Sequence, residues 1–270
     1  DYFLGDLAYA RQDYALAARY YQASASKPEG LVFTHVNALS HLLMALRKSG
    51  RQGEYMRIAD GYLARNPEAW NFRFDYADHL LSVEKVSPDK LLAVIEPVPD
   101  TLFPVRKVPI LSAALVLKSS KQVEKKTGVP IREGLGSLQR AIKLNPEPRP
   151  LAEAICRAGV DAKVAQHAVE LSRNPRAVAS ELVVCAMRWR RTHLLLSMPQ
   201  QAQVAMLNQP HPDLYGDTPL CYAAATRNVK AFSALAKLQV NPAQKCRDGS
   251  TVAERLQQMA FGSDPSIGQM

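Results

Sequence analysis

Apolar residues recur at every third or fourth position through most of this chain, in segments that end at glycine, proline or clusters of polar residues. That spacing places apolar side chains on one face of an α-helix, whereas a half-buried strand would alternate apolar and polar residues. No alternation of the strand type continues beyond a few residues. We therefore expect an all-α protein built from helix pairs.

The first half of the chain contains four predicted helix pairs, over residues 4–28, 31–67, 69–97 and 107–146. In the second pair, a turn at Ser49 and Gly50 separates an apolar helix over residues 32–47 from a helix that starts near residue 54. In the fourth pair, residues 118–130 are charged and end in Gly-Val-Pro. We expect an exposed loop or a frayed helix end there.

A proline cluster over residues 145–150, NPEPRP, predicts the next boundary, because proline cannot continue a helix. Beyond it, helices are predicted over residues 151–158, 162–172, 175–191 and 200–207. Asp161 and Asn174 are suitable N-caps for two of these helices, and Pro175 suits the first helical position. The expected divisions of the chain are residues 1–148, 149–210 and 211–262, with a flexible tail over 263–270.

Residues 4–28, LGDLAYARQDYALAARYYQASASKP, resemble a tetratricopeptide (TPR) repeat. Gly5 stands where the first helix of such a unit approaches the second. Ala17 occupies the small-residue position of the second helix, and Tyr21 occupies the large aromatic one. Small residues at the contact let two helices cross closely, and a bulky residue fills the space beside it. The segment GSLQRAIKLNPEP, at the end of the fourth pair, resembles the end of a TPR unit as well.

Residues 213–224, DLYGDTPLCYAA, resemble the start of an ankyrin repeat, D-x-x-G-x-T-P-L-H-x-A-A. The matching residues are Asp213, Gly216, Thr218, Pro219, Leu220, Ala223 and Ala224. In such a unit, Gly216 supplies a turn at positive φ, and Thr218 with Pro219 begins the first helix. A second start, RDGSTVAERL at residues 247–256, has Val252 in place of the proline. That departure fits a divergent terminal unit, which repeat arrays need as a cap.

The ankyrin resemblance also bears on the cysteines. Cys221 occupies the position of a histidine that usually ties neighbouring loops together, and Cys246 lies in the next hairpin. The resemblance therefore suggests a disulfide between Cys221 and Cys246. The alternative is that all four cysteines, which include Cys156 and Cys185, are free thiols buried as small hydrophobic residues. No CxxC pair is present, so a zinc site is not expected.

Both resemblances imply a right-handed α-solenoid of helix-turn-helix repeats, TPR-like and then ankyrin-like, whose concave face binds a partner. On the TPR-like units the first helices line that face, which gives Tyr2, Asp6, Tyr9, Asn37, Met44 and Arg47. On the ankyrin-like unit the hairpin tip and first helix bind, which gives Tyr215, Asp217 and Tyr222. For a residue such as Tyr9, the alternative is packing against the neighbouring helix.

The formal net charge is +9, and residues 101–150 carry ten Lys or Arg against three Glu. The basic residues that we single out are Lys118, Lys121, Lys125, Lys126, Arg188, Arg190 and Arg191, the last three around Trp189. They form either ordinary solvated helix faces or a surface for an acidic protein or anionic lipid. Nucleic acid is not expected as a partner, because no nucleic-acid motif is present and aromatic residues make up only 7% of the chain.

The sequence contains no motif of a known catalytic site. GxSxG, P-loop, GxGxxG and HExxH patterns do not occur. Asp75 and His79, spaced i, i+4 with Asp78 beside them, could hold a metal or act as a general base. A surface hydrogen bond is the simpler interpretation of that pair. We therefore expect no enzyme activity, no metal and no cofactor.

These patterns together favour a non-enzymatic scaffold that binds a protein partner with an acidic surface patch. The Ala-, Leu-, Gln- and Arg-rich composition suggests a bacterial protein. Because no apolar run of about 18 residues could span a membrane, we expect it to be soluble, in the periplasm or the cytoplasm. A toxin-neutralising (immunity) protein or a secretion adaptor fits best. The alternatives are a peripheral scaffold of a membrane or envelope assembly, which would use the basic residues against lipid, and an enzyme with an unrecognised site.

Overall fold

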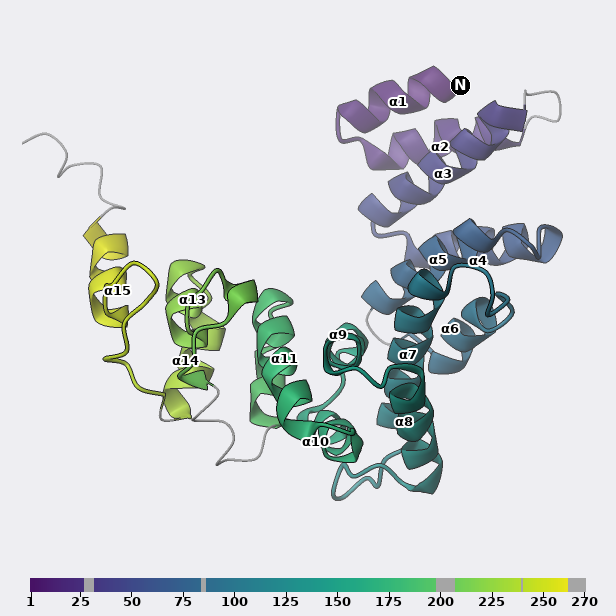
Figure 1. Ribbon diagram of the computed structural model, residues 1–270. Helices are drawn as coiled ribbons and strands as arrows, with labels where there is room; N and C mark the ends of the chain where they lie inside the picture. The colour runs from purple at the N-terminus through teal and green to yellow at the C-terminus, as the bar shows by residue number, and fades with distance from the viewer. Residues whose placement is uncertain (27–31, 84–85, 198–206, 239, 262–270) are drawn as a thin grey trace, which may run out of the picture. The chain divides into compact units, whose positions relative to one another are not determined.

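The computed structural model describes residues 1–26, 32–83, 86–197, 207–238 and 240–261, and these residues are mainly helical (Figure 1). Two isolated β-bridges, Val123 with Pro130 and Lys245 with Thr251, are the only extended pairings within them. The prediction of an all-α protein is confirmed. Along the same residues, no helix is long and apolar enough to cross a membrane.

The chain forms two compact units, Asp1–Tyr76 and Ala77–Met270. The division falls inside helix α5, Trp70–Ser82. In the described part of the first unit, the helices that precede α5 are α1 (Tyr2–Ala10), α2 (Tyr14–Ala25), α3 (Val32–Lys48) and α4 (Gln52–Arg65). Helix α2 packs against both α1 and α3.

Gly5 sets the close approach of α1 and α2. A Cβ atom built on Gly5 would lie 2.5 Å from Cε1 of Tyr21, and the Tyr21 ring is fully buried. The side chain of Asp13 caps α2 by accepting a hydrogen bond from the backbone N–H of Leu16 at 3.0 Å. These are the positions at which the TPR resemblance places a helix contact and a turn.

Tyrosines join α4 to the part of α5 that belongs to the first unit. The Tyr76 hydroxyl donates to Asp60 Oδ1 at 2.8 Å, and the rings of Tyr55 and Tyr76 lie 5.9 Å apart. Burial raises the pKa of Tyr55 to about 12. Both tyrosines therefore serve as neutral core side chains with a polar end.

The described helices of the second unit are α6 (Pro88–Ile95), α7 (Pro104–Lys121), α8 (Arg132–Leu144), α9 (Pro148–Ala158), α10 (Ala162–Leu171), α11 (Pro175–Arg188), η1 (Thr192–Ser197), η2 (Pro212–Leu214), α13 (Pro219–Ala225), α14 (Val229–Lys237) and α15 (Val252–Phe261). Most of them pack on helices close to them in the chain. Helix α9 lies between α7 and α11, and α13 contacts both α14 and α15 (Figure 1).

The helix boundaries differ from the predicted ones where proline is involved. Helix α7 begins at Pro104 and continues to Lys121, so the predicted loop over residues 118–130 is shorter than expected. Helix α9 begins at Pro148, inside the proline cluster that was expected to be a boundary. Both starts use proline in the first turn, where no N–H is needed for a helical hydrogen bond.

At its other end, α11 stops at Arg188 rather than residue 191, because Arg190 adopts a left-handed φ of 56°. The helix predicted over residues 200–207 falls outside the described residues except for Leu207, and so does the tail over 263–270.

Candidate functional site

The side chains of Tyr2 and Asp6 take part in a polar network inside the first unit. Tyr21 donates its hydroxyl to Asp6 Oδ1 at 2.7 Å, and His41 Nδ1 lies 3.2 Å from the same oxygen and 3.0 Å from the Tyr2 hydroxyl. Burial, followed by the hydrogen bond to Asp6, raises the pKa of Tyr21. The network joins α1, α2 and α3, so these side chains hold three helices together.

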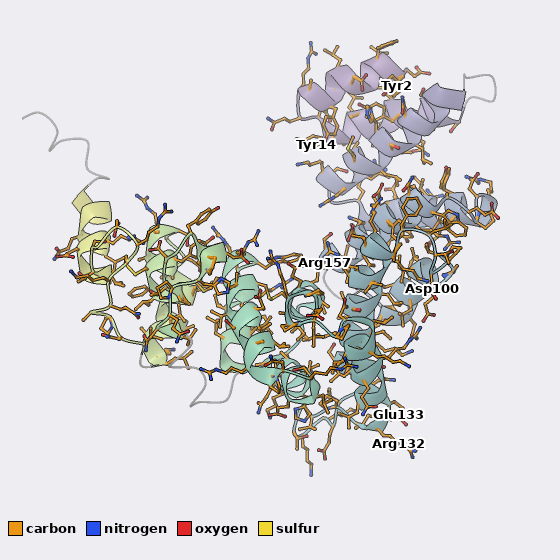
Figure 2. The ribbon with its side chains drawn as sticks, in the orientation of Figure 1. Tyr2, Tyr14, Asp100, Arg132, Glu133 and Arg157 are labelled. Atoms are coloured by element: carbon orange, nitrogen blue, oxygen red, sulfur yellow. A yellow bond between two sulfur atoms is a disulfide. The ribbon has the colours of Figure 1, made fainter. Side chains whose placement is uncertain are left out.

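The other predicted residues of the first unit differ in exposure, and Tyr9 is half-buried like Tyr2 and Asp6. The Tyr9 ring packs edge-on against the ring of Tyr14, which is labelled in Figure 2, with ring centres 5.1 Å apart. On α3, Asn37 is half-buried, while Met44 and Arg47 are exposed and lie one turn apart. Met44 and Arg47 therefore remain available to a partner.

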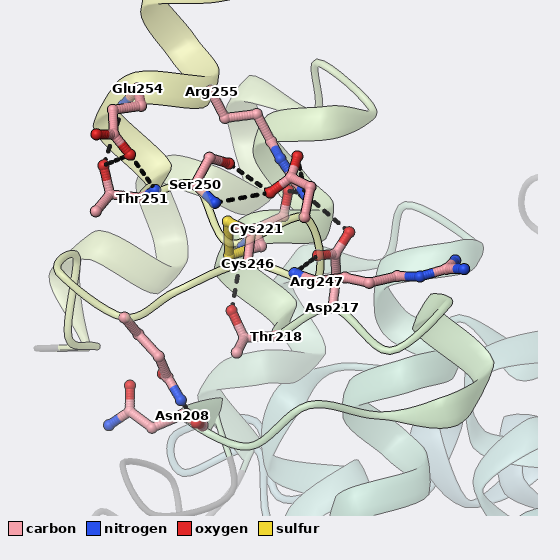
Figure 3. Close-up of a disulfide and its surroundings, with 12 residues drawn as sticks. Asn208, Asp217, Thr218, Cys221, Cys246, Arg247, Ser250, Thr251, Glu254 and Arg255 are labelled. Atoms are coloured by element: carbon pink, nitrogen blue, oxygen red, sulfur yellow. Dashed lines mark hydrogen bonds and ion pairs between the residues drawn. A yellow bond between two sulfur atoms is a disulfide. The ribbon is translucent and has the colours of Figure 1, made fainter.

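In the C-terminal part, Cys221 on α13 is bonded to Cys246, which lies in the hairpin ahead of α15 (Figure 3). Asp217 lies beside this disulfide and is buried. Its carboxylate accepts hydrogen bonds from the backbone N–H of Arg247 and from Arg255 Nη1, both at 2.9 Å. Asp217, which the resemblance placed on the binding surface, is thus committed to internal contacts.

Arg255 connects this cluster to a second carboxylate. Its Nη2 lies 2.9 Å from Asp248 Oδ2, and its Nη1 also donates to the carbonyl of Cys221 at 3.2 Å. Hydrogen bonds from Ser250 and Arg255 lower the pKa of Asp248 to about 2. Tyr215 and Tyr222 stack outside the cluster with ring centres 6.4 Å apart, and Tyr215 is 71% exposed.

The remaining two cysteines are paired as well, since Cys156 on α9 is bonded to Cys185 on α11. No free cysteine is left in the chain, all four being among the described residues. In the part of the chain that the structure describes, the one group of three side chains with metal-ligand spacing is Asp217, Cys221 and Cys246. Its sulfur atoms are bonded to each other and its carboxylate is occupied, so the group does not suit a metal.

Asp75 and His79 both lie on α5, where Asp75 is exposed and the His79 side chain is buried. They do not join a third metal-ligating side chain among the described residues. The interpretation as a surface pair therefore fits Asp75 only, since His79 lies in the buried face of the helix.

The predicted basic residues do not share one environment. Lys118 Nζ pairs with Asp89 of α6 at 2.8 Å, whereas Lys121, Lys125 and Lys126 are exposed at the end of α7 and in the turn that follows. The Arg191 side chain covers Gly159, because a Cβ atom added to that glycine would lie 3.0 Å from Arg191 Cζ. Arg188 and Arg190 are exposed and pair with no acidic residue in the described part of the chain.

Trp189, which stands between these two arginines in the chain, lines a surface cleft of the second unit. The cleft is formed by the start of α7, by α9 and by the residue that follows α11, and its volume is about 270 Å³. Its apolar lining comes from Val105, Pro109, Ile110, Ala154 and Trp189. Val105 is 86% exposed and Trp189 is 45% exposed. Solvent-exposed aromatic and aliphatic side chains around a cavity are typical of binding surfaces.

Arginine side chains neutralise the acidic residues of the cleft. The guanidinium of Arg157, labelled in Figure 2, lies 5.9 Å from the centre of the Trp189 ring and 3.5 Å from Asp78 Oδ1. Arg149 Nε lies 3.4 Å from Glu153 Oε1. The hydrogen bond with Glu153, reinforced by Asp213, raises the pKa of Arg149. Because both acids are paired, the excess charge around Trp189 is positive.

The turn between α6 and α7 leads into Val105 of the cleft and is held by a buried lysine. Lys107 Nζ donates to the backbone carbonyl of Val98, to Asp100 Oδ1 at 2.6 Å and to the carbonyl of Glu96 at 3.4 Å. Only 6% of the Lys107 side chain is exposed, and the lysine contact lowers the pKa of Asp100. Carbonyls at the C-terminal end of a helix attract a cation.

Sequence reasoning did not identify this cleft. The run Arg188–Trp189–Arg190–Arg191 was noticeable, but Val105 and Arg157 lie far from it in the chain. In the sequence, Lys107 is one of many basic residues, and no local pattern indicates that its side chain is buried. The chain matches no protein-family model, and no curated protein sequence matches it significantly.

Proposed function

We propose that this protein is a non-enzymatic scaffold that binds a protein partner, with the cleft at Trp189 as part of the contact surface. The observation that carries the proposal is an exposed tryptophan in a cleft, flanked by two arginines without acidic partners among the described residues. Tryptophan and arginine are the residue types that contribute most to protein interfaces.

The helical architecture supports this function. We propose that the helix pairs are repeat units, TPR-like in the first unit and ankyrin-like near the C-terminus, in a right-handed α-solenoid. The ankyrin-like proposal is supported by two equivalent turns, in which Gly216 and Gly249 have φ values of 79° and 82°. Each glycine is followed two residues later by a threonine at a helix start, Thr218 for α13 and Thr251 for α15.

We further propose that the protein folds in an oxidising compartment, such as the bacterial periplasm. All four cysteines are paired, and each disulfide joins two elements of the second unit. Disulfides of this structural kind persist outside the reducing cytoplasm. Both a toxin-neutralising protein and a secretion adaptor can use such a surface, and the identity of the partner decides between them.

A peripheral membrane scaffold is the second candidate function. The observation that favours it is the group of exposed lysines around the end of α7, Lys121, Lys125 and Lys126. Binding to vesicles that contain phosphatidylserine, lost between low and physiological salt, would support this candidate. Vesicle binding that is missing at low salt would remove it.

The proposed function is tested by capture of a partner with the complete, oxidised protein. The purified chain is immobilised, exposed to an envelope extract of its native organism, and washed at physiological salt. We expect one protein to be retained in a defined ratio to the immobilised chain and to form the same complex after purification. A failure of every retained protein to bind when purified would overturn the proposal.

A further inference from the structure

We propose that the Trp189 cleft binds an acidic peptide segment of the partner and that a bulky apolar side chain of this segment inserts against Trp189 and Val105. The inference rests on the proposed protein-binding function and specifies the chemistry of the ligand. Three properties lead to it: the size and apolar lining of the cleft, the charge around it, and the ordered turn that precedes Val105.

The size of the cleft suits side chains of a peptide better than a whole small molecule. Its volume of about 270 Å³ is below the roughly 300–1,000 Å³ of sites that enclose drug-sized ligands. Pro109, Ile110 and Ala154 form apolar lining, and Val105 and Trp189 are exposed beside them. One or two apolar side chains inserted there would cover surface that is now in water.

A proline inside α7 forms part of the wall of the cleft. Pro109 lies inside the helix and has no N–H, so it cannot donate to the carbonyl of Val105 four residues earlier. Val105 and Pro109 both line the cleft.

Charge selects an acidic segment over a basic one. The carboxylates of the cleft, Asp78 and Glu153, are paired with Arg157 and Arg149. Arg188 and Arg190 pair with no described acid and flank the exposed Trp189. Carboxylates on either side of an apolar anchor would meet these guanidinium groups, which bind carboxylates in a bidentate geometry.

The turn that precedes Val105 is ordered in the absence of a ligand. Lys107 holds the turn over residues 96–103 through the carbonyls of Glu96 and Val98 and the carboxylate of Asp100. Val105 therefore follows a fixed turn rather than a loose loop. A surface that is ordered before binding loses less conformational entropy when the peptide docks.

The test uses the complete, oxidised chain with Trp70→Phe, which leaves Trp189 as its one tryptophan. The probe is a blocked hexapeptide in which a leucine–phenylalanine pair stands between two glutamates on each side. We expect a saturable change in Trp189 fluorescence at low salt. Two control peptides replace the central pair by serines or the four glutamates by lysines, and both should bind at least about tenfold more weakly.

Variants locate the binding. Trp189→Ala should weaken binding of a fluorescein-labelled form of the peptide by about 30-fold or more, as expected for an interface anchor. Arg188→Gln with Arg190→Gln should weaken it by about tenfold. The matched control is Arg173→Gln with Arg176→Gln, which removes two exposed charges at the start of α11 and should change the affinity less than twofold.

The outcomes separate the inference from the function on which it rests. Equal binding of the glutamate and lysine peptides, or equal losses in the two double-arginine variants, would overturn the acidic-peptide inference. So would vesicle binding that requires Arg188 and Arg190 when the peptide does not bind. If a captured partner still binds the Arg188→Gln/Arg190→Gln variant at full affinity, the scaffold function stands and this cleft is not its site.

Discussion

Gly5 and the buried ring of Tyr21 occupy one contact between α1 and α2, and no other residue type fits at that position without a shift. A Cβ atom there would approach the Tyr21 ring to 2.5 Å, well inside van der Waals contact. Gly61, in the interior of α4, has no neighbouring atom within 4 Å of the equivalent position. Gly5 is therefore required by a helix contact, whereas the position of Gly61 leaves room for a side chain.

We expect Gly5→Ala to lower the free energy of unfolding of the first unit by about 1 to 3 kcal/mol, because the helices must separate or the Tyr21 ring must move. Gly61→Ala is the matched control and should raise it by about 0.5 to 1 kcal/mol through helix propensity. Urea denaturation followed by circular dichroism measures both changes. Equal effects of the same sign would contradict the assigned contact.

Asp248 provides a pH-dependent contribution to stability. Ser250 and Arg255 lower its pKa from the ordinary value of 3.8 to about 2, so the ionised form is favoured in the folded state. A carboxylate with a lowered pKa stabilises the fold above its unfolded pKa, and that contribution is lost as pH falls through the folded value. The relevant window is therefore about pH 4 down to about pH 2.

We expect the melting temperature of the wild-type chain to fall more steeply than that of Asp248→Asn between pH 4 and pH 2. The wild-type slope also contains Asp100 and Glu254, whose pKa values are lowered by Lys107 and by Thr251. The difference between the two proteins isolates Asp248. Parallel melting curves across this pH range would show that the Arg255 contact does not affect its ionisation.

At the scale of elements, the stability of the second unit depends on hydrogen bonds to the free backbone groups at the ends of its helices. Thr251 and Glu254 form a reciprocal capping box at the start of α15, with the Thr251 N–H donating to Glu254 Oε2 at 2.6 Å. At the end of α6, Lys107 supplies the donors that the last carbonyls lack. Both arrangements use charged side chains to fix the geometry of a turn.

We expect Lys107→Met to lower the free energy of unfolding by about 1 to 3 kcal/mol, because it leaves buried carbonyls without donors. The control Lys118→Met makes the same substitution on the same helix, but removes an ion pair whose Asp89 side chain is 77% exposed. It should cost less than about 1 kcal/mol. Guanidinium denaturation of both variants provides the comparison, and similar losses would contradict a special role for Lys107.

At the scale of the whole molecule, the two disulfides each close a short segment of the second unit. Cys156 and Cys185 are 29 residues apart, and Cys221 and Cys246 are 25 apart. The first bond joins α9, which lines the Trp189 cleft, to α11, which Trp189 directly follows. Cross-links of this length restrict the unfolded chain and so favour the folded one.

We expect each paired Cys→Ser substitution to lower stability by about 3 to 4 kcal/mol, as chain entropy predicts for loops of this size. Reduction of the wild-type protein should lower the urea midpoint, while reduction of the variant that lacks all four cysteines should change nothing. Peptide mapping without reduction identifies the bonds. Titration of free thiols in the protein purified from its native source would contradict both the pairing and the proposed compartment.

The sequence predicts the helices of this protein better than it predicts the cleft. Apolar spacing and caps such as Asn174, which accepts from the N–H of Ala177, are local, so most helices were predicted within a few residues. The starts of α7 and α9 were predicted three residues too late, because a proline stops one helix and can also begin the next. Trp189 was noticed as the centre of a basic run, but its cavity depends on α7 and α9.

The sequence by itself determined the all-helical class, because helix periodicity and capping depend on residues that are close together in the chain. It also suggested the Cys221–Cys246 pairing, but only through the ankyrin resemblance. The tertiary structure decided that Asp217 is buried, that Cys156 is bonded to Cys185 and that Val105, Arg157 and Trp189 share one cleft. These properties arise from contacts between residues distant in the chain, and no local pattern of side chains encodes such contacts.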